Sequence, residues 1–420
     1  MALRSTLALK NIFTRRSFVS GVCACLLSAC AAGGGSVPGP QTSALDQSFA
    51  NQPASRLQRP TNVKVAFLLP LTAKGNTGKT AQGLKQAGEL ALFEFDKPNV
   101  VLITKDTKGT PEGAKAAAQA ALAEGAELVI GPLFSKSVTA AAAVTRQAGV
   151  PMIAFSSDRA VAGNGVYLLS FLAGQDVQRI LSYAVGAGKQ NFAALVPDTQ
   201  YGKIVETSLR MAAQNIGAHI ATVERYPADA NGMLEPARRI KQVAINSKNS
   251  GRPVDALLIP AGKEALPTLA TLMPYFEINT TEIQLLGTGD WDYAGIGREA
   301  PLVGGWFSAP DPRGWRDFTQ RYAKTYGGVP PRIASLAYDA VSLAVSLSNN
   351  QASFRYTTAN LTRGSGFAGV DGLFRLKPDG TSERGLAILQ VQKFGSRVIQ
   401  PAPSVFGKSN SGGVAGWLSN

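Results

Sequence analysis

The sequence is poor in the residues on which most catalytic and metal sites depend. It has three cysteines and one histidine in 420 residues. Cys23 and Cys25 lie in an N-terminal segment that resembles an export signal, and Cys30 lies at its end, so no thiol remains in the mature chain for a disulfide, a nucleophile or a zinc site. His219, in GAHIATVERYP, is expected at the start of a strand as a structural residue. Triads that combine histidine with other residues are therefore excluded.

Charged residues are few, and positive ones outnumber negative ones. Charged residues make up 17% of the chain, and the formal net charge is +14. A basic surface favours nucleic acid, anionic lipid or an anionic polymer such as a cell-wall glycan. Because no run of lysine and arginine is interleaved with aromatics, we expect no nucleic-acid partner. With 45% hydrophobic residues, the chain is long enough for two domains with ordinary cores.

The first residues have the pattern of a targeting signal. Basic residues and no acid precede the apolar run FVSGVCACLLSAC, which is too short to cross a bilayer. We therefore predict a signal peptide over residues 1–29. LSAC at its end resembles a bacterial lipobox, so Cys30 is expected to carry lipid. Arg15 and Arg16 fit either a twin-arginine export motif or an ordinary basic segment.

Two further segments lack periodic apolar residues. Residues 31–61 are rich in Gly, Pro, Ser, Gln and Asn, which predicts a flexible tether between the lipid anchor and the folded body. Residues 401–420 are predicted to be a flexible tail.

Between tether and tail, short apolar runs alternate with alanine-rich amphipathic segments. The predicted strands are 63–69, 100–104, 128–130, 152–155, 192–196, 220–224, 256–259 and 283–286, and the predicted helices are 80–95, 111–124, 138–147, 202–215, 234–246 and one from Lys263. Uniformly apolar strands indicate parallel sheets covered on both faces. The pattern restarts near Ala173, so we predict an α/β protein of two doubly wound, Rossmann-like lobes with a cleft between them.

One loop has the spacing of a phosphate-binding loop. AKGNTGKT, residues 73–80, offers Gly78, Lys79 and Thr80 in the required order, with Ala73 in place of the first glycine. No later strand ends in an aspartate suited to hold Mg²⁺ beside them. We therefore interpret this loop as the rim of a cleft.

Polar residues gather where the predicted strands end. In the first lobe these include Ser135, Ser156, Ser157 and Asp158, and in the second Tyr201, Asp290, Trp291 and Asp292. They suit a hydrogen-bonding cleft but form no catalytic set. Each also has a structural interpretation: a helix cap for Ser135, turn residues for the other serines, packing for Tyr201 and a solvated turn for the residues from 290 to 292.

Over residues 63–392 the chain resembles type I periplasmic binding proteins of the leucine/isoleucine/valine-binding class. The resemblance lies in the order and spacing of VAFLLPLT, DTKGTPEGAKAAAQAAL, VIGPLFSKSVTAAAAV, GVPMIAFSS, LVPDTQYGK and FAGVDGLFRLKPDG. The LLPLT opening, the second and third motifs and the lipobox look most like the penicillin-binding protein activators. Those are non-enzymatic outer-membrane lipoproteins thought to stimulate peptidoglycan synthases.

The resemblance implies a chain that crosses between the lobes three times. The first lobe is then expected over residues 62–172 plus 309–360, and the second over 173–308 plus 361–400. It also implies ligand contacts at Thr72, Ser135, Ser156 to Asp158, Tyr201 and the residues after Leu286, here Asp290 and Trp291.

Two positions depart from the family pattern. Asp158 stands where a carboxylate-binding threonine is usual, and Gly289 stands where an acid for the ligand's ammonium group is expected, with Asp290 one place later. Two anions at close range repel each other when partly desolvated. The two departures therefore argue against an ordinary leucine-type ligand.

Three functions follow for this periplasmic, lipid-anchored chain, with the outer membrane as the expected location. It is a membrane-tethered activator that contacts a peptidoglycan synthase, a receptor that delivers a small amino-acid-like solute to an ABC permease, or, with least support, an enzyme. No cofactor and no metal are expected. Fold alone does not choose among these functions.

Overall fold

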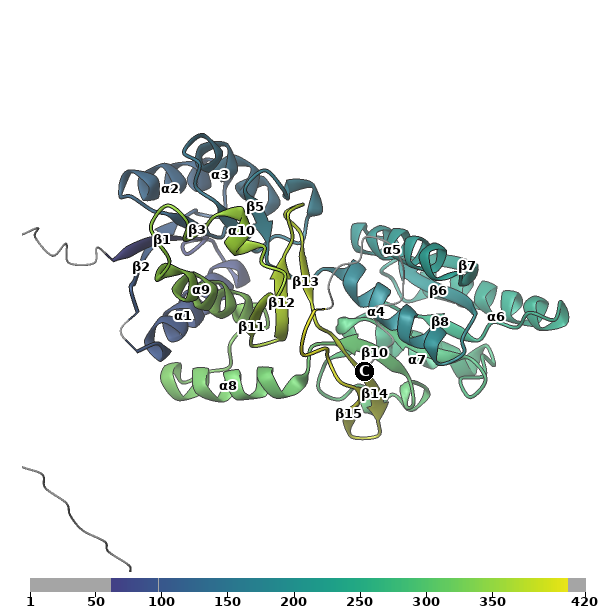
Figure 1. The fold of residues 1–420 in the computed structure, drawn as a ribbon. Coiled ribbons are helices and arrows are strands. Elements are labelled where there is room, and N and C mark those ends of the chain that lie inside the picture. Colours follow the sequence, from purple (N-terminus) through teal and green to yellow (C-terminus); the bar gives the residue numbers. More distant parts are fainter. Residues whose placement is uncertain (1–61, 97, 407–420) are drawn as a thin grey trace, which may run out of the picture. The chain divides into compact units, whose positions relative to one another are not determined.

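A computed structural model describes residues 62–96 and 98–406 (Figure 1). The predicted signal peptide, the lipidation at Cys30, the tether to residue 61 and the tail from residue 407 lie outside the described residues. The predicted tail begins too early, because the chain is still packed at Phe406, where the guanidinium of Arg375 lies 4.6 Å from the centre of the Phe406 ring. Within the described residues, no helix is both apolar enough and long enough to cross a membrane.

The first lobe is built on a parallel sheet of five strands in the order β2-β1-β3-β4-β5. The strands are β1 (Val63–Leu69), β2 (Val100–Asp106), β3 (Leu128–Ile130), β4 (Met152–Ala154) and β5 (Val166–Leu168). Helices α1 (Asn76–Glu94) and α9 (Ala334–Ser348) cover one face, and α2 (Pro111–Ala123) and α3 (Ser135–Gln147) cover the other (Figure 1). Both faces are therefore buried, as the uniformly apolar strands predict.

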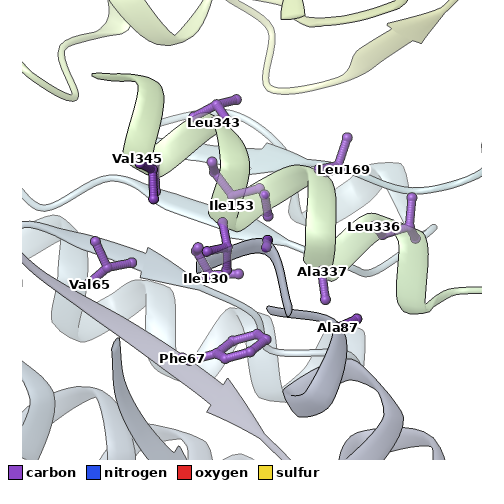
Figure 2. Packing of buried hydrophobic residues seen from close by; sticks show 14 of the residues in the cluster. Val65, Phe67, Ala87, Ile130, Ile153, Leu169, Leu336, Ala337, Leu343 and Val345 are labelled. Carbon is purple, nitrogen blue, oxygen red and sulfur yellow. The ribbon is translucent and has the colours of Figure 1, made fainter. Parts of the chain in front are cut away.

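The core between this sheet and its two covering helices is shown in Figure 2. Phe67, Ile130 and Ile153 project from the strands toward Ala87 of α1 and Ala337 of α9, and all five are fully buried. Small residues let the helices lie close to the sheet. At Gly88 of α1, a Cβ atom would lie only 2.7 Å from the ring of Phe67, so a larger residue there would push the helix away from β1.

The second lobe repeats the same strand order. Its sheet runs β15-β14-β10-β9-β8-β6-β7, and the five strands from β10 to β7 are parallel. The strands are β6 (Asn191–Pro197), β7 (His219–Tyr226), β8 (Ala256–Leu258), β9 (Gln284–Gly287), β10 (Trp306–Ala309), β14 (Ala387–Gln392) and β15 (Gly395–Gln400). The last two are antiparallel additions. Helices α4 (Ala173–Gly186) and α5 (Gln200–Ile216) cover one face, and α6 (Leu234–Asn249) and α7 (Leu266–Tyr275) contribute to the other.

The two doubly wound lobes are confirmed. Three helices begin two to four residues earlier than predicted, two begin at the predicted residue, and α7 begins at Leu266, three residues later than predicted. His219 starts β7, as expected, and its ring nitrogen Nδ1 lies 2.6 Å from Oδ1 of Asn191. The remaining elements are α8 (Pro312–Tyr326), which packs against α1, α10 (Thr358–Leu361) and five short 3₁₀ turns (Arg159–Val161, Asn231–Met233, Gly289–Trp291, Ile296–Arg298 and Ala300–Leu302).

Residues 361–384 depart from the predicted division. They contain a small antiparallel sheet of β11 (Phe367–Gly369), β12 (Gly372–Leu376) and β13 (Ser382–Arg384). Phe367, Val370, Phe374 and Leu376 belong to the same core as α9 and the first sheet. The assignment of residues 361–384 to the second lobe is therefore wrong, because their apolar side chains are buried in the first. The chain joins the second sheet only at β14.

Candidate functional site

The predicted site residues of the first lobe lie at the carboxyl ends of its strands, where their side chains are largely occupied by local hydrogen bonds. Thr72, after β1, donates its hydroxyl to Oδ2 of Asp106 at 2.6 Å, and its amide lies 3.3 Å from Oδ1 of the same residue. This bond joins the loops that follow β1 and β2. Thr72 is exposed and holds one loop to its neighbour.

Ser135 begins α3 but does not cap it. The cap position is Phe134, and no side-chain hydrogen bond closes this helix end. The capping interpretation of Ser135 is therefore wrong. Its carbonyl oxygen accepts from the Thr139 hydroxyl, and its side chain is half-buried at the end of β3.

The loop after β4 is folded on itself. Ser156 is buried, and its hydroxyl accepts the Asp158 amide at 3.2 Å. Asp158 in turn accepts the Ala160 amide at 3.0 Å and caps the 3₁₀ turn over Arg159–Val161. Ser157 and Asp158 are exposed. A carboxylate at position 158 thus has a structural role as a cap, for which aspartate is well suited.

The phosphate-loop spacing of residues 73–80 does not form an open loop. Helix α1 already begins at Asn76, so Gly78, Lys79 and Thr80 lie in its first turns. A Cβ atom on Gly78 would meet the Ala73 carbonyl oxygen at 2.2 Å, which shows how tightly the turn closes. The Lys79 amide lies 3.5 Å from the Gly75 carbonyl oxygen as the first contact of the helix ladder, whereas the amides before it are those that a helix leaves without an intrahelical partner.

Tyr201 and Asp290 come together in the second lobe. Thr199 caps α5 and places Tyr201 in its first turn. The Tyr201 hydroxyl lies 3.1 Å from Oγ1 of Thr288, which lies 3.5 Å from Oδ2 of Asp290. Burial and the charge of Asp290 raise the pKa of Tyr201, so this hydroxyl stays protonated and able to donate.

Trp291 is a core residue and does not line a cleft. Its side chain is fully buried, and its indole N–H donates to the Ile259 carbonyl at 2.9 Å. Gly287 lies against the indole, where a Cβ would come within 2.2 Å of the ring. The prediction for Trp291 is therefore wrong, because the 3₁₀ turn over Gly289–Trp291 turns the indole into the sheet's hydrophobic core.

A cavity of about 200 Å³ lies where the segments that join the lobes meet. We call it the linker cavity. It is lined by Ser170, Phe171, Leu172, Ala173, Gln175, Asp176, Tyr201, Gly289, Asp290, Asp292, Pro310, Arg332, Arg384 and Leu386. Of the residues with an implied ligand contact, Tyr201 and Asp290 line it, and so does Asp292, which the sequence placed among the polar residues at the strand ends. Thr72, Ser135, Ser156, Ser157, Asp158 and Trp291 lie outside its lining.

Asp176, in the first turns of α4, is the most perturbed acid of the linker cavity. The Ser308 hydroxyl donates to its carbonyl oxygen at 2.9 Å and lies 3.4 Å from its carboxylate Oδ1. Part of Asp176 stays accessible from the cavity, yet burial raises its pKa to about 8, with the charge of Asp290 adding to the effect. Hydrogen bonds from Ser308 and the Gly289 amide act in the opposite direction. Near neutral pH the Asp176 carboxyl group is therefore protonated, so this wall of the cavity holds a proton.

Two arginines line the cavity from the first lobe. Arg332, just before α9, donates to both carboxylate oxygens of Asp371 at 3.1 and 2.6 Å and stacks on the ring of Phe171 at 4.6 Å. Arg384, at the end of β13, lies 3.5 Å from Oδ2 of Asp339 through its Nη1. Burial raises the pKa of Asp339 to about 7, although the charge of Arg384 opposes this.

Asp176, Arg332 and Arg384 were not among the predicted site residues. Those predictions were confined to polar residues at the carboxyl ends of strands, where open α/β sheets bind ligands. These three lie instead beside the segments that join the lobes. The expected crossing near Ala173 lies three residues from Asp176 and was the available signal. No sequence signal pointed to Arg384, because the segment that forms β13 was assigned to the wrong lobe.

Comparisons with solved structures show the same fold in several binding proteins. An ABC transporter substrate-binding protein from Sphaerobacter thermophilus matches at 18% identity with a TM-score of 0.64, covering 82% of this chain and 98% of that one. One from Desulfitobacterium hafniense in complex with Leu matches at 17% identity and a TM-score of 0.57, covering 80% and 99%. A third match is a solute binding protein of an ABC transporter from Rhodopseudomonas palustris in complex with 3,4-dihydroxy benzoic acid. Its sequence identity is 17% and its TM-score 0.54, and the match covers 81% of this chain and 98% of that one.

At these identities the similarity establishes the fold. Comparison with curated proteins finds no match. The family described as Periplasmic binding protein matches residues 62–396, which is nearly the whole of the described chain. The chain therefore belongs to the periplasmic binding protein family.

Proposed function

We propose that this protein binds a small polar solute in the linker cavity and presents it to an ABC transporter permease. One observation carries the proposal. Tyr201 and Asp290, at the carboxyl ends of second-lobe strands, line a cavity of about 200 Å³ together with Asp176 and two arginines. Such a concave site with a few convergent polar groups and perturbed acids is typical of small-molecule binding.

The family and its structural relatives support this function. The relatives named above are substrate-binding proteins of ABC transporters by their names, and two of them hold leucine or a dihydroxybenzoic acid. Binding proteins of this kind act without catalysis, and we propose the same here. A periplasmic location follows from family membership. Anchoring through Cys30, at the outer membrane, remains a prediction that fractionation of a Cys30→Ala variant would test.

A thermal-shift and calorimetric screen tests binding directly. The screen includes amino acids, aromatic acids, sugars and polyamines. A ligand at 100 times its Kd stabilises the folded state by about 2.7 kcal/mol. Asp290→Asn should weaken binding of the solute found. Asp158→Asn is the matched control, because it removes an acid that lies at a strand end outside the cavity. The absence of stabilisation by every solute would contradict the proposal.

The activator function is the second candidate, favoured by the lipobox that ends at Cys30. The names of the structural relatives refer to ABC transporters and give it no support. It predicts that the lipidated chain binds a purified peptidoglycan synthase, and that the interaction survives Tyr201→Ala and Ser135→Ala. No interaction with the wild-type chain would remove this candidate.

A further inference from the structure

We propose that Arg332 is a clamp on the segments that join the two lobes, and that this clamp restrains the opening of the lobes when no solute is bound. The linker cavity lies among these segments, so the clamp also sets the position of its walls. The inference goes beyond the proposed function, because the opening of the lobes is measured without any solute.

Three short segments join the lobes. Residues 169–172 connect β5 to α4, residues 310 and 311 connect β10 to α8, and residues 385 and 386 connect β13 to β14. In each case one of the two elements packs in the first lobe and the other in the second. A rotation of one lobe against the other must therefore be absorbed by the backbone dihedral angles of these few residues.

Phe171 belongs to the first joining segment, but its ring is held by the first lobe. The Arg332 guanidinium lies 4.6 Å from the centre of the Phe171 ring, and the Arg384 guanidinium lies 5.4 Å from it. A cation over an aromatic ring is attracted more strongly where water is partly excluded, and Phe171 is half-buried. A rotation that carried the ring away from Arg332 would lose this attraction.

Arg332 also holds the chain just beyond the second joining segment. Trp315 lies in the first turn of α8, and the centre of its ring is 4.5 Å from the Arg332 guanidinium. A planar guanidinium stacks on aromatic rings, which a lysine ammonium does not do. One side chain thus links two of the three joining segments.

The clamp is fixed to the first lobe by an ion pair. The terminal nitrogens of Arg332 lie 3.1 and 2.6 Å from the two carboxylate oxygens of Asp371, and Nη1 lies 3.2 Å from the Ser335 hydroxyl. A bidentate pair of this kind fixes the plane of the guanidinium as well as its position. Because the plane is fixed, the rings stack on it only in a narrow range of joining-segment conformations.

The third joining segment is tied to the first through α4. The Arg384 amide donates to Oε1 of Gln175 at 3.0 Å, and Nε of Arg179 donates to the Leu386 carbonyl at 2.8 Å. Gln175 and Arg179 lie in α4, directly after the first joining segment. The segments therefore move together, and holding Phe171 restrains all of them.

The competing explanation is that Arg332 only neutralises Asp371. Arg332→Lys separates the two roles, because a lysine keeps a positive charge beside Asp371 but has no plane to stack on the rings. Phe171→Leu breaks the same stack and leaves the ion pair intact, so it tests the clamp even where Arg332→Lys unfolds the chain. Phe406→Leu is the matched control, because its ring lies at the same 4.6 Å from the Arg375 guanidinium, within the first lobe.

The separation of the lobes is measured by pulsed electron paramagnetic resonance on the full chain. Cys23, Cys25 and Cys30 are replaced by serine, which leaves no other cysteine in the sequence. Spin labels are then attached at Lys136→Cys in the first lobe and Lys263→Cys in the second, two positions that are exposed.

Without any solute, Arg332→Lys and Phe171→Leu should each broaden the distribution of distances between the labels. The double variant should broaden it no further than the wider of the two single variants, because both changes remove the same contact. Phe406→Leu should leave the distribution as in the wild type. Urea unfolding of each variant establishes that it is folded under the conditions of the measurement.

Three outcomes would overturn the clamp. An unchanged distribution in the folded single variants would show that Arg332 only neutralises Asp371. Broadening in the double variant that equals the sum of the single effects would show that the two residues act separately. Equal broadening in Phe406→Leu would show a general loosening of the first lobe. Each of these results leaves the proposed solute binding untouched, and a solute screen without a hit leaves the clamp untouched.

Discussion

Arg332 and Asp371 form a bidentate ion pair, in which the two terminal nitrogens of Arg332 lie 2.6 and 3.1 Å from the two carboxylate oxygens of Asp371. This pair joins the start of α9 to the turn between β11 and β12. The pair is asymmetric. Asp371 is fully buried, whereas 37% of the Arg332 side chain is exposed. Burial favours the protonated acid, but the charges of Arg332 and Arg384 and the Ser335 hydroxyl outweigh it and lower the pKa of Asp371.

Removing the arginine should therefore cost more than removing the acid. Arg332→Met leaves a buried carboxylate without its main partner, which costs about 3–5 kcal/mol of unfolding free energy. Asp371→Asn leaves an arginine that can still reach water, so the loss should be smaller. Urea unfolding measures both. Arg238→Met, which removes an exposed ion pair with Glu235, should change stability by about 1 kcal/mol or less. Equal losses for the first two variants would contradict the asymmetry.

Trp291 should matter for stability and not for ligand binding. Trp291→Ala opens a large hole beneath Gly287 and should cost about 3–5 kcal/mol. Trp291→Phe should cost less, roughly 1–3 kcal/mol, because it leaves the Ile259 carbonyl without its buried donor. Ligand affinity of the phenylalanine variant, measured by calorimetry, should stay within about twofold of wild type, since buried core residues act through folding. If Trp291→Phe lost ligand affinity without losing stability, Trp291 would have to be part of the binding site.

The physics of single elements explains which predictions succeeded. Uniformly apolar strands such as 192–196 leave few options other than a parallel sheet covered on both faces. The orientation of Trp291 was not predictable in this way. Its sequence GTGDWDY allows a solvated turn or a buried one, and only the space left by Gly287 and Gly305 makes the indole part of the core.

The cavity was less predictable than the fold because its residues come from distant parts of the chain. Tyr201 and Asp290 follow strands that the sequence pattern identifies. Arg384 and Asp176 meet only because Gln175 accepts the Arg384 amide at 3.0 Å, a contact between residues 209 positions apart. Periodicity carries no information about such a contact. An error in the lobe assignment of residues 361–384 was enough to hide it.

The hydrogen bond between Thr72 and Asp106 should stabilise the folded state only at a pH where Asp106 is ionised. Burial acts to raise the pKa of Asp106, but hydrogen bonds from the Thr72 hydroxyl and the Lys108 and Thr72 amides lower it overall below 3.8. A lowered pKa contributes stability above about pH 4 that is lost as the pH falls through the folded-state value. Asp106→Asn should therefore lower the Tm at pH 7, and the difference from wild type should shrink toward pH 3. A difference that is constant with pH would contradict this assignment.

The opposite sign applies to Asp176. Its ordinary pKa of 3.8 rises to about 8 in the folded chain through burial and the charge of Asp290. Between these values the folded state keeps a proton that the unfolded state has released, so this group makes stability fall as the pH rises from about 4 to about 8. Above about pH 8 the Asp176 carboxyl group is ionised in both states, so its effect on the free energy of unfolding no longer changes with pH.

Asp176→Asn should remove this loss and keep an oxygen that can accept from Ser308 and the Gly289 amide. We expect the ligand-free variant to be more stable than wild type at pH 8 by roughly 1–2 kcal/mol, a figure reduced for the access of water through the cavity, and to differ little at pH 4. Ser308→Ala should act in the other direction, because it removes a hydrogen bond that favours the ionised form. Urea unfolding at pH 4, 6 and 8 measures all three chains. Parallel pH profiles for Asp176→Asn and wild type would show that the carboxyl group is ionised in the folded protein, and the proton assigned to this wall of the cavity would be absent.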